Sequence, residues 1–264
     1  MNGAQAASKN RAIWRGVLWL ATAASLLWGG VFTLRALSDE RVLRTIALAE
    51  TQGAPTDEAQ ALALAGWIDR KVPRLTIGDL DRPFLRMGPT EIIEKGGMCG
   101  ELSRLLINLL REVKIPAHRV YLFDQGRFTD AVDTFNVNVE AWIDGRWVVF
   151  DTYYYEHFRL ADGRLATTAD LVRDRDLLKQ SKTPLKATSY LHVSRINWSR
   201  PRWIGPMLFR LVSLALGERA RDLALPAIFE QPNMLLGLAG LCVAVLGMLL
   251  ILLGRNDRAE QRTT

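Results

Sequence analysis

The chain has 264 residues, of which 49% are hydrophobic and 23% charged, and a formal net charge of +6 at pH 7. This charge content excludes intrinsic disorder or a coiled coil as a description of the whole chain. The mean hydropathy of +0.04 averages two unlike populations, because residues 16–34 and 234–253 carry no charged side chain and flank a water-soluble middle. Each stretch is about as long as a helix that crosses ~30 Å of hydrocarbon. A wholly soluble enzyme and a polytopic transporter are therefore both excluded, and the middle is long enough for one domain.

The chain begins with a basic tail, residues 1–15, which contains no acidic side chain. Residues 16–37 then form the first expected membrane-spanning helix. A cleavable signal peptide is the alternative, with Ala36 and Ser38 as small residues near the cut. We favour an uncleaved anchor, because the apolar run exceeds the ~7–15 residues that are usual for a signal peptide.

The second expected span covers residues 231–254 and is followed by a short polar tail, residues 255–264, that begins with an arginine. Two spans place both termini on the same side, and the basic tails favour the cytoplasmic side. We therefore expect a cell-membrane protein, of the bacterial inner-membrane kind, with both termini cytoplasmic. Residues 38–200 form the expected extracytoplasmic domain, and residues 201–230 an amphipathic segment on the membrane surface.

The basic pI of about 9.6 does not indicate a nucleic-acid partner. Much of the basic excess lies in the tails and near the spans, where membrane topology and anionic lipid explain it. The middle contains no run of Lys and Arg with interleaved aromatic residues, which is the pattern of a single-strand groove. The lipid bilayer is an expected partner, and nucleic acid is not.

Helical apolar spacing predicts helices at Ser38–Ala49 and Asp57–Val72, separated by a Gly-Ala-Pro break and with Asp57 as the N-cap of the second. A short helix is expected to open at residues 88–90. Two glycines stop it, and a new helix starts at once with an unbroken apolar stripe. Cys99 lies in the first turn of this buried helix.

The chain then alternates between apolar and polar residues, which is the pattern of antiparallel strands. Strands are expected at His118–Phe123, Phe135–Ile143 and Arg146–Thr152, with Asp144-Gly145 as a two-residue hairpin turn. Later expected elements are a helix at Thr168–Gln180, a strand at Thr188–Val193 and a surface helix at Trp203–Gly217. Helices followed by an antiparallel meander define an α+β fold.

The two-residue turn also fixes the register of the hairpin. The expected pairs are Ile143 with Arg146, Trp142 with Trp147, Glu140 with Val149 and Asn138 with Asp151. Asp151 therefore lies across from Asn138 and diagonal to Asn136, all on one face of the sheet. Val137 and Val139 point to the other face.

Cys99 is the candidate nucleophile, because the second cysteine, Cys242, lies in a span and is too remote for a disulfide. The free N–H groups and the dipole at a helix start favour the thiolate and lower the thiol pKa below ~8.5. Gly96 and Gly97 would let the backbone approach a substrate closely, and the N–H of Cys99 is placed to hold an oxyanion. Such a nucleophile requires a base, and the base requires an orienting acceptor.

Two blocks of the chain, GGMCGELSRLLINLLREVKIPAHRV and NVNVEAWIDGRWVVFDT, resemble the core of the transglutaminase-like superfamily, which has a papain-like cysteine-protease fold. The resemblance runs from about Ala61 to Thr152. It implies Cys99 as the nucleophile and Asp151 as the orienting acid. The position of the family's catalytic histidine falls on Asn136.

An asparagine cannot accept and return a proton near neutral pH, so the usual thiol–imidazole pair is missing. Three histidines remain. His118 is expected to be an exposed or strand-edge residue, and His192 to lie outside the resembling core. His157 follows Asp151 closely enough in the chain for folding back over the cleft to stay open as an alternative. The sequence has no spacing typical of metal ligands, so neither a metal nor another cofactor is expected.

Trp147, Tyr154 and His157 are the candidate substrate-binding residues, because all three lie close to Asp151 in the chain. Packing is the alternative for the two aromatic residues. Trp147 faces Trp142 across the hairpin, and Tyr154 belongs to a run of three tyrosines.

Two functions from different classes remain open. In the first, the domain is a degenerate or non-standard acyl-transfer site that serves cell-envelope assembly or polymer export by binding a protein or peptide. In the second, it is a thiol peptidase, amidase or transglutaminase-type acyltransferase in which Cys99 forms a thioester with the help of a surrogate base. Asn136 favours the first.

Overall fold

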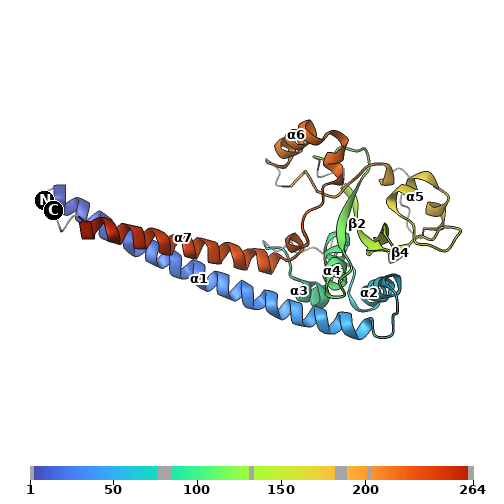
Figure 1. The fold of residues 1–264 in the computed structure, drawn as a ribbon, viewed down its shortest axis with the longest axis horizontal. Coiled ribbons are helices and arrows are strands. Elements are labelled where there is room, and N and C mark those ends of the chain that lie inside the picture. The colour runs from blue at the N-terminus through green and yellow to red at the C-terminus, as the bar shows by residue number, and fades with distance from the viewer. Residues whose placement is uncertain (1–2, 77–84, 131–133, 182–188, 201–203, 261–264) are drawn as a thin grey trace. The chain divides into compact units, whose positions relative to one another are not determined.

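The computed structural model describes residues 3–76, 85–130, 134–181, 189–200 and 204–260 (Figure 1). The chain divides into two compact units. One contains Met1–Asp39 and Gln231–Thr264, and the other contains Glu40–Glu230. The long helix α1 (Gly3–Glu50) contributes to both, because it continues without a break into the segment that the sequence marks as a separate helix.

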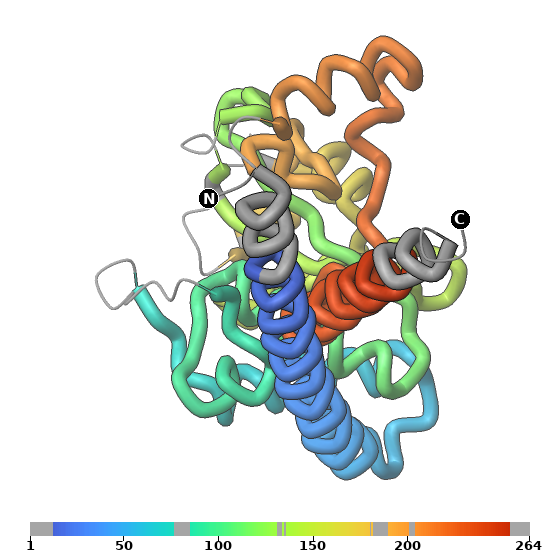
Figure 2. Tube along the Cα trace, turned by 90° about the vertical axis from the view of Figure 1, so that its left-hand side faces the viewer, coloured from blue at the N-terminus to red at the C-terminus, as the bar shows by residue number. Residues whose placement is uncertain are grey.

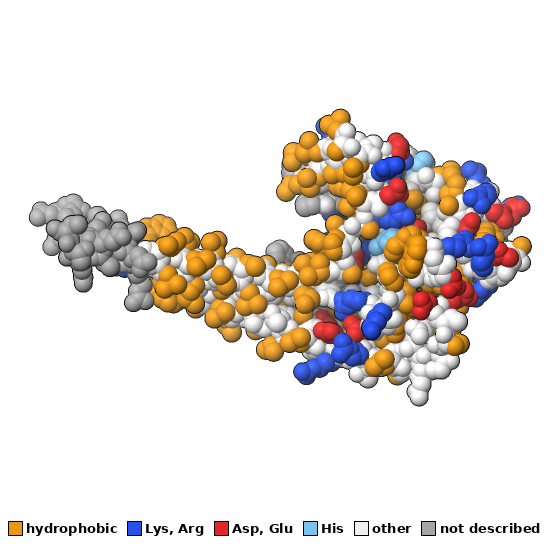
Figure 3. Space-filling model, viewed as in Figure 1, with side chains coloured by type: hydrophobic (Ala, Val, Ile, Leu, Met, Phe, Trp, Pro, Cys, Tyr) orange, Lys and Arg blue, Asp and Glu red, His pale blue; other side chains and the backbone are white. Residues whose placement is uncertain are grey.

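The first unit consists of the N-terminal part of α1 and of α7 (Pro232–Glu260). Both helices are long and apolar enough to cross a membrane. Leu20, Leu27 and Leu246 are among their many exposed apolar side chains. Hydrophobic side chains cover most of the described part of this unit that Figure 3 shows. An apolar outer surface of this kind suits contact with lipid.

Glycines let α1 and α7 lie side by side, as Figure 2 shows. A Cβ atom on Gly240 would lie 2.7 Å from the backbone nitrogen of Gly29, and one on Gly29 would lie 2.8 Å from that of Leu241. Such close backbone approach through small residues is typical of helix pairs in membranes. Near the end of the pair, Asn233 donates a 2.7 Å hydrogen bond to Asp39.

Three further helices precede the sheet in the second unit: α2 (Asp57–Lys71), α3 (Pro89–Lys95) and α4 (Cys99–Glu112). They confirm the predicted helices, but the expected N-cap of α2 is wrong. The Thr56 hydroxyl accepts the Ala59 N–H at 3.1 Å, and Thr56 has the extended backbone of a cap residue. Asp57 is instead the first helical residue, where its charge favours the helix dipole.

The sheet is antiparallel and has five strands in the order β4-β3-β2-β1-β5. Its strands are β1 (Ala117–Phe123), β2 (Thr134–Ile143), β3 (Arg146–Asp151), β4 (Glu156–His157) and β5 (Val193–Ser194). The predicted hairpin register is confirmed, with Ile143 paired to Arg146 and Trp142 to Trp147. Asp144 and Gly145 have φ angles of 50° and 75°, as a type I′ turn requires.

The main core lies between α4 and one face of the sheet. The apolar side chains of α4, Leu105 and Leu109 among them, pack with Val139, Ala141 and Phe150. These strand residues alternate with polar ones, so Asn136, Asn138 and Glu140 point to the opposite face. The fold is therefore α+β, as predicted.

The region after the sheet is less regular than expected. Thr168–Gln180 is not one helix but α5 (Thr168–Arg173) and a 3₁₀ helix (Leu177–Gln180), because the extended backbone of Asp174 ends α5. Ser189–Leu191 is a 3₁₀ helix that leads into β5, and residue 188 lies outside the described residues. Helix α6 (Gly205–Leu216) matches the predicted surface helix from residue 205 onwards.

Candidate active site

Cys99 is the first residue of α4 and is half-buried. The expected role of the glycines before it is not what the structure shows. Gly97 donates to the Pro73 carbonyl at 3.0 Å and accepts from the Leu75 N–H at 3.0 Å. Gly96 has a φ of +86°, and a Cβ atom there would collide with Pro73. Their backbones therefore hold the Pro73–Leu75 segment against the helix start, and do not lie open to a substrate.

Ser103, one turn along α4, connects this helix to the ends of two strands. Its hydroxyl donates to the Val137 carbonyl at 2.9 Å and lies 3.1 Å from the hydroxyl of Thr152. The backbone of Val137 also forms a hydrogen bond with the Cys99 thiol. The thiol is thereby placed beside the residue that follows Asn136.

Asn136 and Asp151 form the buried pair that the register predicts. Asn136 Nδ2 donates to Asp151 Oδ2 at 2.9 Å and to Asn138 Oδ1 at 3.2 Å, while Asn136 Oδ1 accepts the Val137 N–H at 2.8 Å. The other Asp151 oxygen accepts the N–H groups of residues 153 and 154, each at 3.0 Å. Both carboxylate oxygens therefore have donors, and one of these donors is the side-chain carboxamide of Asn136.

Burial dominates the electrostatics of the site. It raises the pKa of Asp151 to about 6, although hydrogen bonds from Tyr154, Tyr153 and Asn136 act in the opposite direction. Burial also raises the pKa of the Cys99 thiol, and the nearby Glu101 and Asp151 carboxylates raise it further. The expected lowering of the thiol pKa by the helix start is therefore wrong, because hydrogen bonds from Val137 and Gly100 do not outweigh these effects.

The three histidines lie away from this pair. His118 is not exposed as expected, because Glu140 and Arg195 cover it: its Nε2 atom is 2.8 Å from Glu140 Oε2 and 2.8 Å from Arg195 Nε. His157 pairs with Phe150, so it shares the sheet face opposite to that of Asp151. The ring of His192 lies beside Gly126. None of these rings forms a described hydrogen bond with Cys99, Asn136 or Asp151.

The three candidate substrate-binding residues are not brought together. Tyr154 lies three residues after Asp151 and is 41% exposed. Partial burial raises the pKa of its phenol, and the charges of Asp151 and Cys99 raise it further. Trp147 packs on the His118 ring, with 4.2 Å between ring centroids. His157 lies 6.1 Å from the ring of Tyr155. Only Tyr154 therefore borders the Cys99 site.

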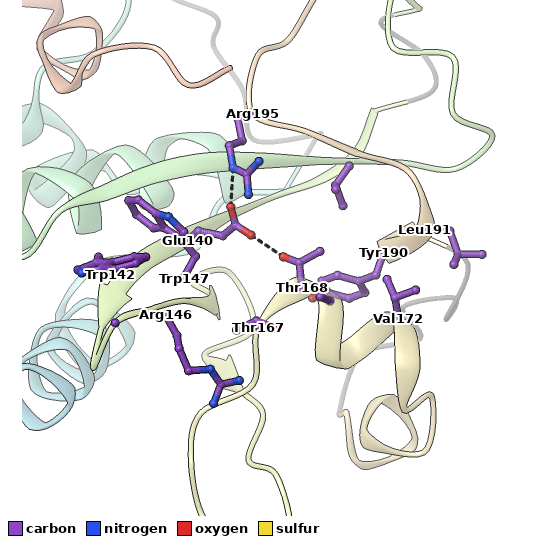
Figure 4. A pocket seen from close by; sticks show the side chains of 13 residues that line it. Glu140, Trp142, Arg146, Trp147, Thr167, Thr168, Val172, Tyr190, Leu191 and Arg195 are labelled. Atoms are coloured by element: carbon purple, nitrogen blue, oxygen red, sulfur yellow. Dashed lines mark hydrogen bonds and ion pairs between the residues drawn. The ribbon is translucent and has the colours of Figure 1, made fainter. Parts of the chain in front are cut away.

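Trp147 instead lines a cavity of about 630 Å³ on the polar face of the sheet (Figure 4). The buried Glu140 carboxylate forms part of its lining and is held by Thr168 at 2.6 Å and by Arg195 at 2.9 Å. Tyr190 also lines the cavity, and its hydroxyl accepts a 2.9 Å hydrogen bond from Asn138. A polar row therefore extends along β2 from Asp151 to this cavity.

Two residues of this row, Glu140 and Tyr190, were not among the predicted site residues. Glu140 shares the alternation that places Asn136 and Asn138 on one face, so the strand pattern could have indicated it. Tyr190 had no such signal, because it lies in a 3₁₀ helix far along the chain. Among the described residues, no group of three His, Cys, Asp or Glu side chains is placed to hold a metal ion.

Residues 44–152 match the family model of the transglutaminase-like superfamily, and this range contains Cys99, Asn136 and Asp151. These residues thus form a transglutaminase-like domain. The chain is similar to a candidate cysteine protease from Cytophaga hutchinsonii, with 23% identity and a TM-score of 0.36 over 44% of this chain and 38% of that one.

A candidate protease from Parabacteroides distasonis is also similar, with 16% identity and a TM-score of 0.35 over 47% of this chain and 26% of that one. The chain thus spans well under half the length of either solved structure. No curated protein matches it.

Proposed function

We propose that the protein is a membrane-anchored binding module of the cell envelope whose transglutaminase-like domain has lost thiol–imidazole catalysis. One observation carries this proposal. The Asn136 amide donates to Asp151 at 2.9 Å, in the position that the resemblance gives to the catalytic histidine. A carboxamide cannot take up and return a proton near neutral pH, so it fills the place of the base without its chemistry.

The state of the thiol supports the same conclusion. Cysteine attacks as the thiolate, and the pKa of Cys99 is raised by burial and by two carboxylates. No described imidazole offsets this effect by an ion pair. The domain would act in envelope assembly or polymer export by binding a protein or peptide. We assign this binding to the surface around Tyr154, which is exposed beside the Cys99 site.

The proposed topology places both termini in the cytoplasm and residues 38–200 outside. Two apolar helices and the basic tails support it. A reporter that works only outside the cytoplasm should be active in the turn at Gly163, where the chain is exposed and open, and silent after Thr264. Activity at both places would contradict this topology.

Restoring the missing base tests the chemical part of the proposal. In the purified full chain, Asn136→His should raise hydrolysis of an activated ester by ~10²–10⁴-fold, the usual contribution of general acid–base catalysis. Adding Cys99→Ala should abolish the gain. Asn138→His is the matched control, because it introduces the same ring on the same face at a residue whose amide donates to Tyr190 and not to Asp151; it should give no gain.

A cellular experiment tests the binding role. Cys99→Ala should leave the function of the chain in its own cell intact, whereas Tyr154→Glu should impair it by charging the exposed surface. Loss of function with Cys99→Ala, at unchanged expression and folding, would overturn the binding proposal.

One observation favours the alternative, an active thiol peptidase, amidase or acyltransferase. The pKa of Asp151 is raised to about 6 by burial, which brings this carboxylate near the range of a general base at neutral pH. In that case Asp151 itself replaces the imidazole, and a thioester forms on the unmodified chain. Mass spectrometry after mixing with an activated ester decides between the two, because acylation of Cys99 that is faster in the native chain than in the urea-unfolded chain would require the alternative.

A further inference from the structure

Helix α6 has two apolar faces, and only one of them is covered by protein. On the inner face, Phe209 packs on Trp198 at 5.3 Å and on Phe128 at 6.0 Å between ring centroids. Val212 joins the same cluster, which includes Phe123 at the end of β1. This face fixes α6 to the sheet.

The outer face carries large side chains that nothing described covers. Leu214 is 85% exposed, Leu211 56% and Met207 55%. Their spacing of three and four residues places them on one side of the helix. In Figure 3 hydrophobic side chains gather over α6, at the top of the view. A patch of this kind on a soluble surface marks an interaction site.

The segment after α6 continues the same exposure. Leu223, Leu225 and Phe229 are exposed, and the chain then enters α7, which is long and apolar enough to span a membrane. Within α6 the only charged residue is Arg210, which is exposed. The cationic head of such a side chain can reach water or lipid headgroups while its stem lies along an apolar surface.

The occupant of this face follows from the connection to α7. Exposed apolar side chains continue along the chain from α6 through Leu223, Leu225 and Phe229 to Pro232, where α7 begins, so the outer face of α6 is continuous in sequence with a helix that is apolar enough to span a bilayer. An exposed apolar face that leads along the chain into a span suits the boundary between lipid headgroups and acyl chains.

We propose that α6 lies in the bilayer interface, with Met207, Leu211 and Leu214 among the lipid chains, and that it docks the second unit onto the membrane. This rests on the membrane anchoring in the proposed function. The docking would reach the sheet through Phe128, which contacts both Phe209 of α6 and Phe123 of β1, and the neighbouring Leu122 pairs with Asn136. The binding domain would therefore have a fixed orientation to the membrane surface.

Depth-dependent fluorescence quenching tests the proposal on the full chain in phosphatidylcholine vesicles. In a background with Cys99→Ala and Cys242→Ala, an environment-sensitive dye is attached through Leu214→Cys. Quenching should be strongest with lipids brominated ~5–10 Å below the headgroup boundary. Lys179→Cys, at a side chain that is 78% exposed, is the water-facing control and should be quenched by iodide and not by lipid.

A third label separates the possible failures. Val245→Cys lies on the exposed surface of α7 and should be quenched by deeply brominated lipid. If this label responds to lipid but the label at residue 214 responds only to iodide, α6 does not dock and this inference is wrong, while the anchoring stands. If neither responds to lipid, the anchoring itself fails.

A charge substitution gives a second measurement. With the dye at Met207→Cys, adding Leu211→Glu and Leu214→Glu should abolish quenching by lipid and restore quenching by iodide, because two carboxylates oppose insertion. Unchanged lipid quenching in this variant would contradict the proposed role of the outer face.

Discussion

Two polar clusters lie along the same face of β2, and each contains only some of the groups of a thiol–imidazole–carboxylate site. The cluster around Asn136 contains a thiol and a carboxylate but no imidazole. The cluster around Glu140 contains an imidazole and a carboxylate, 2.8 Å apart, but no thiol. Residue type alone therefore does not define a site, because His118 on β1 pairs with Glu140 and not with Asn136, which lies four residues earlier on β2.

The two clusters also differ in how their carboxylates are held. Asp151 accepts hydrogen bonds from two backbone N–H groups and from the Asn136 side-chain carboxamide, and burial raises its pKa. Glu140 is equally buried, but its pKa is lowered, because the hydrogen bond of His118, the charge of Arg195 and the Thr168 hydroxyl outweigh burial. Burial therefore shifts Asp151 towards its neutral form relative to an exposed carboxyl, whereas the Arg195 cation helps to keep Glu140 ionised.

The largest expected effect is a loss of unfolding free energy when the Glu140 carboxylate is removed. Glu140→Ala removes the acceptor of His118 and Arg195 from the interior, and loss of one partner of a buried ion pair costs about 4 kcal/mol of unfolding free energy. The control is Asp222→Ala, which removes the 69% exposed second partner of Arg195 and should change stability by less than ~1 kcal/mol. Urea denaturation measures both, and equal losses would contradict the difference.

The pH dependence should have opposite signs in the two clusters. Asp151 has a folded pKa of about 6 against an ordinary 3.8, so the folded state binds the proton more tightly. Its contribution is fully present below pH ~3.9 and is lost as the pH rises through about 6, a change of about 3 kcal/mol. Glu140 contributes above pH ~4.3 and loses its contribution as the pH falls through its lowered folded pKa.

Comparing stability curves from pH 3 to pH 8 checks this. Asp151→Asn should remove the decline in stability between about pH 4 and 6. Glu140→Gln should instead remove a decline on the acid side. The interpretation of the Asp151 cluster would be wrong if Asp151→Asn left the slope between pH 4 and 6 unchanged.

The sequence predicted the parts of this face that depend on local pattern. The Asp144-Gly145 turn fixed the hairpin pairs, and strict alternation then placed Asn136 and Asp151 together. The apolar stripe after Cys99 likewise predicted α4. Each of these follows from neighbours in the chain, so no knowledge of the tertiary structure was needed.

The parts that were missed depend on distant segments. Only 10% of the His118 side chain is exposed, because Trp147 and Arg195, which lie far along the chain, pack against its ring. The raised pKa of Cys99 reflects burial and the distant Asp151, whereas the sequence displays only the helix start. Tyr190 reaches Asn138 from a segment without periodic pattern. Burial is a property of the assembled fold, so local patterns cannot supply it.

The hydrogen bond between Asn138 and Tyr190 connects the two clusters, and it gives an intermediate effect. Tyr190→Phe keeps the ring in the cavity wall but leaves the Asn138 amide without its acceptor. A buried unsatisfied donor costs ~1–3 kcal/mol, so unfolding free energy should fall by about 2 kcal/mol. Tyr154→Phe is the matched control, because its ring is 41% exposed, and it should be nearly neutral. A neutral Tyr190→Phe variant would show that the two clusters are independent.

The smallest expected effect concerns the second oxygen of Glu140. Thr168→Val keeps the shape of the side chain at the start of α5 but removes the 2.6 Å hydrogen bond to Glu140 Oε1. Because Arg195 and His118 still hold the other oxygen, the carboxylate stays ionised and the loss should be about 1 kcal/mol. In the Glu140→Gln background the same substitution should have an even smaller effect, since the acceptor is then uncharged. A double-mutant cycle by urea denaturation measures this difference. Equal losses in both backgrounds would mean that the charge of Glu140 does not strengthen its contact with α5.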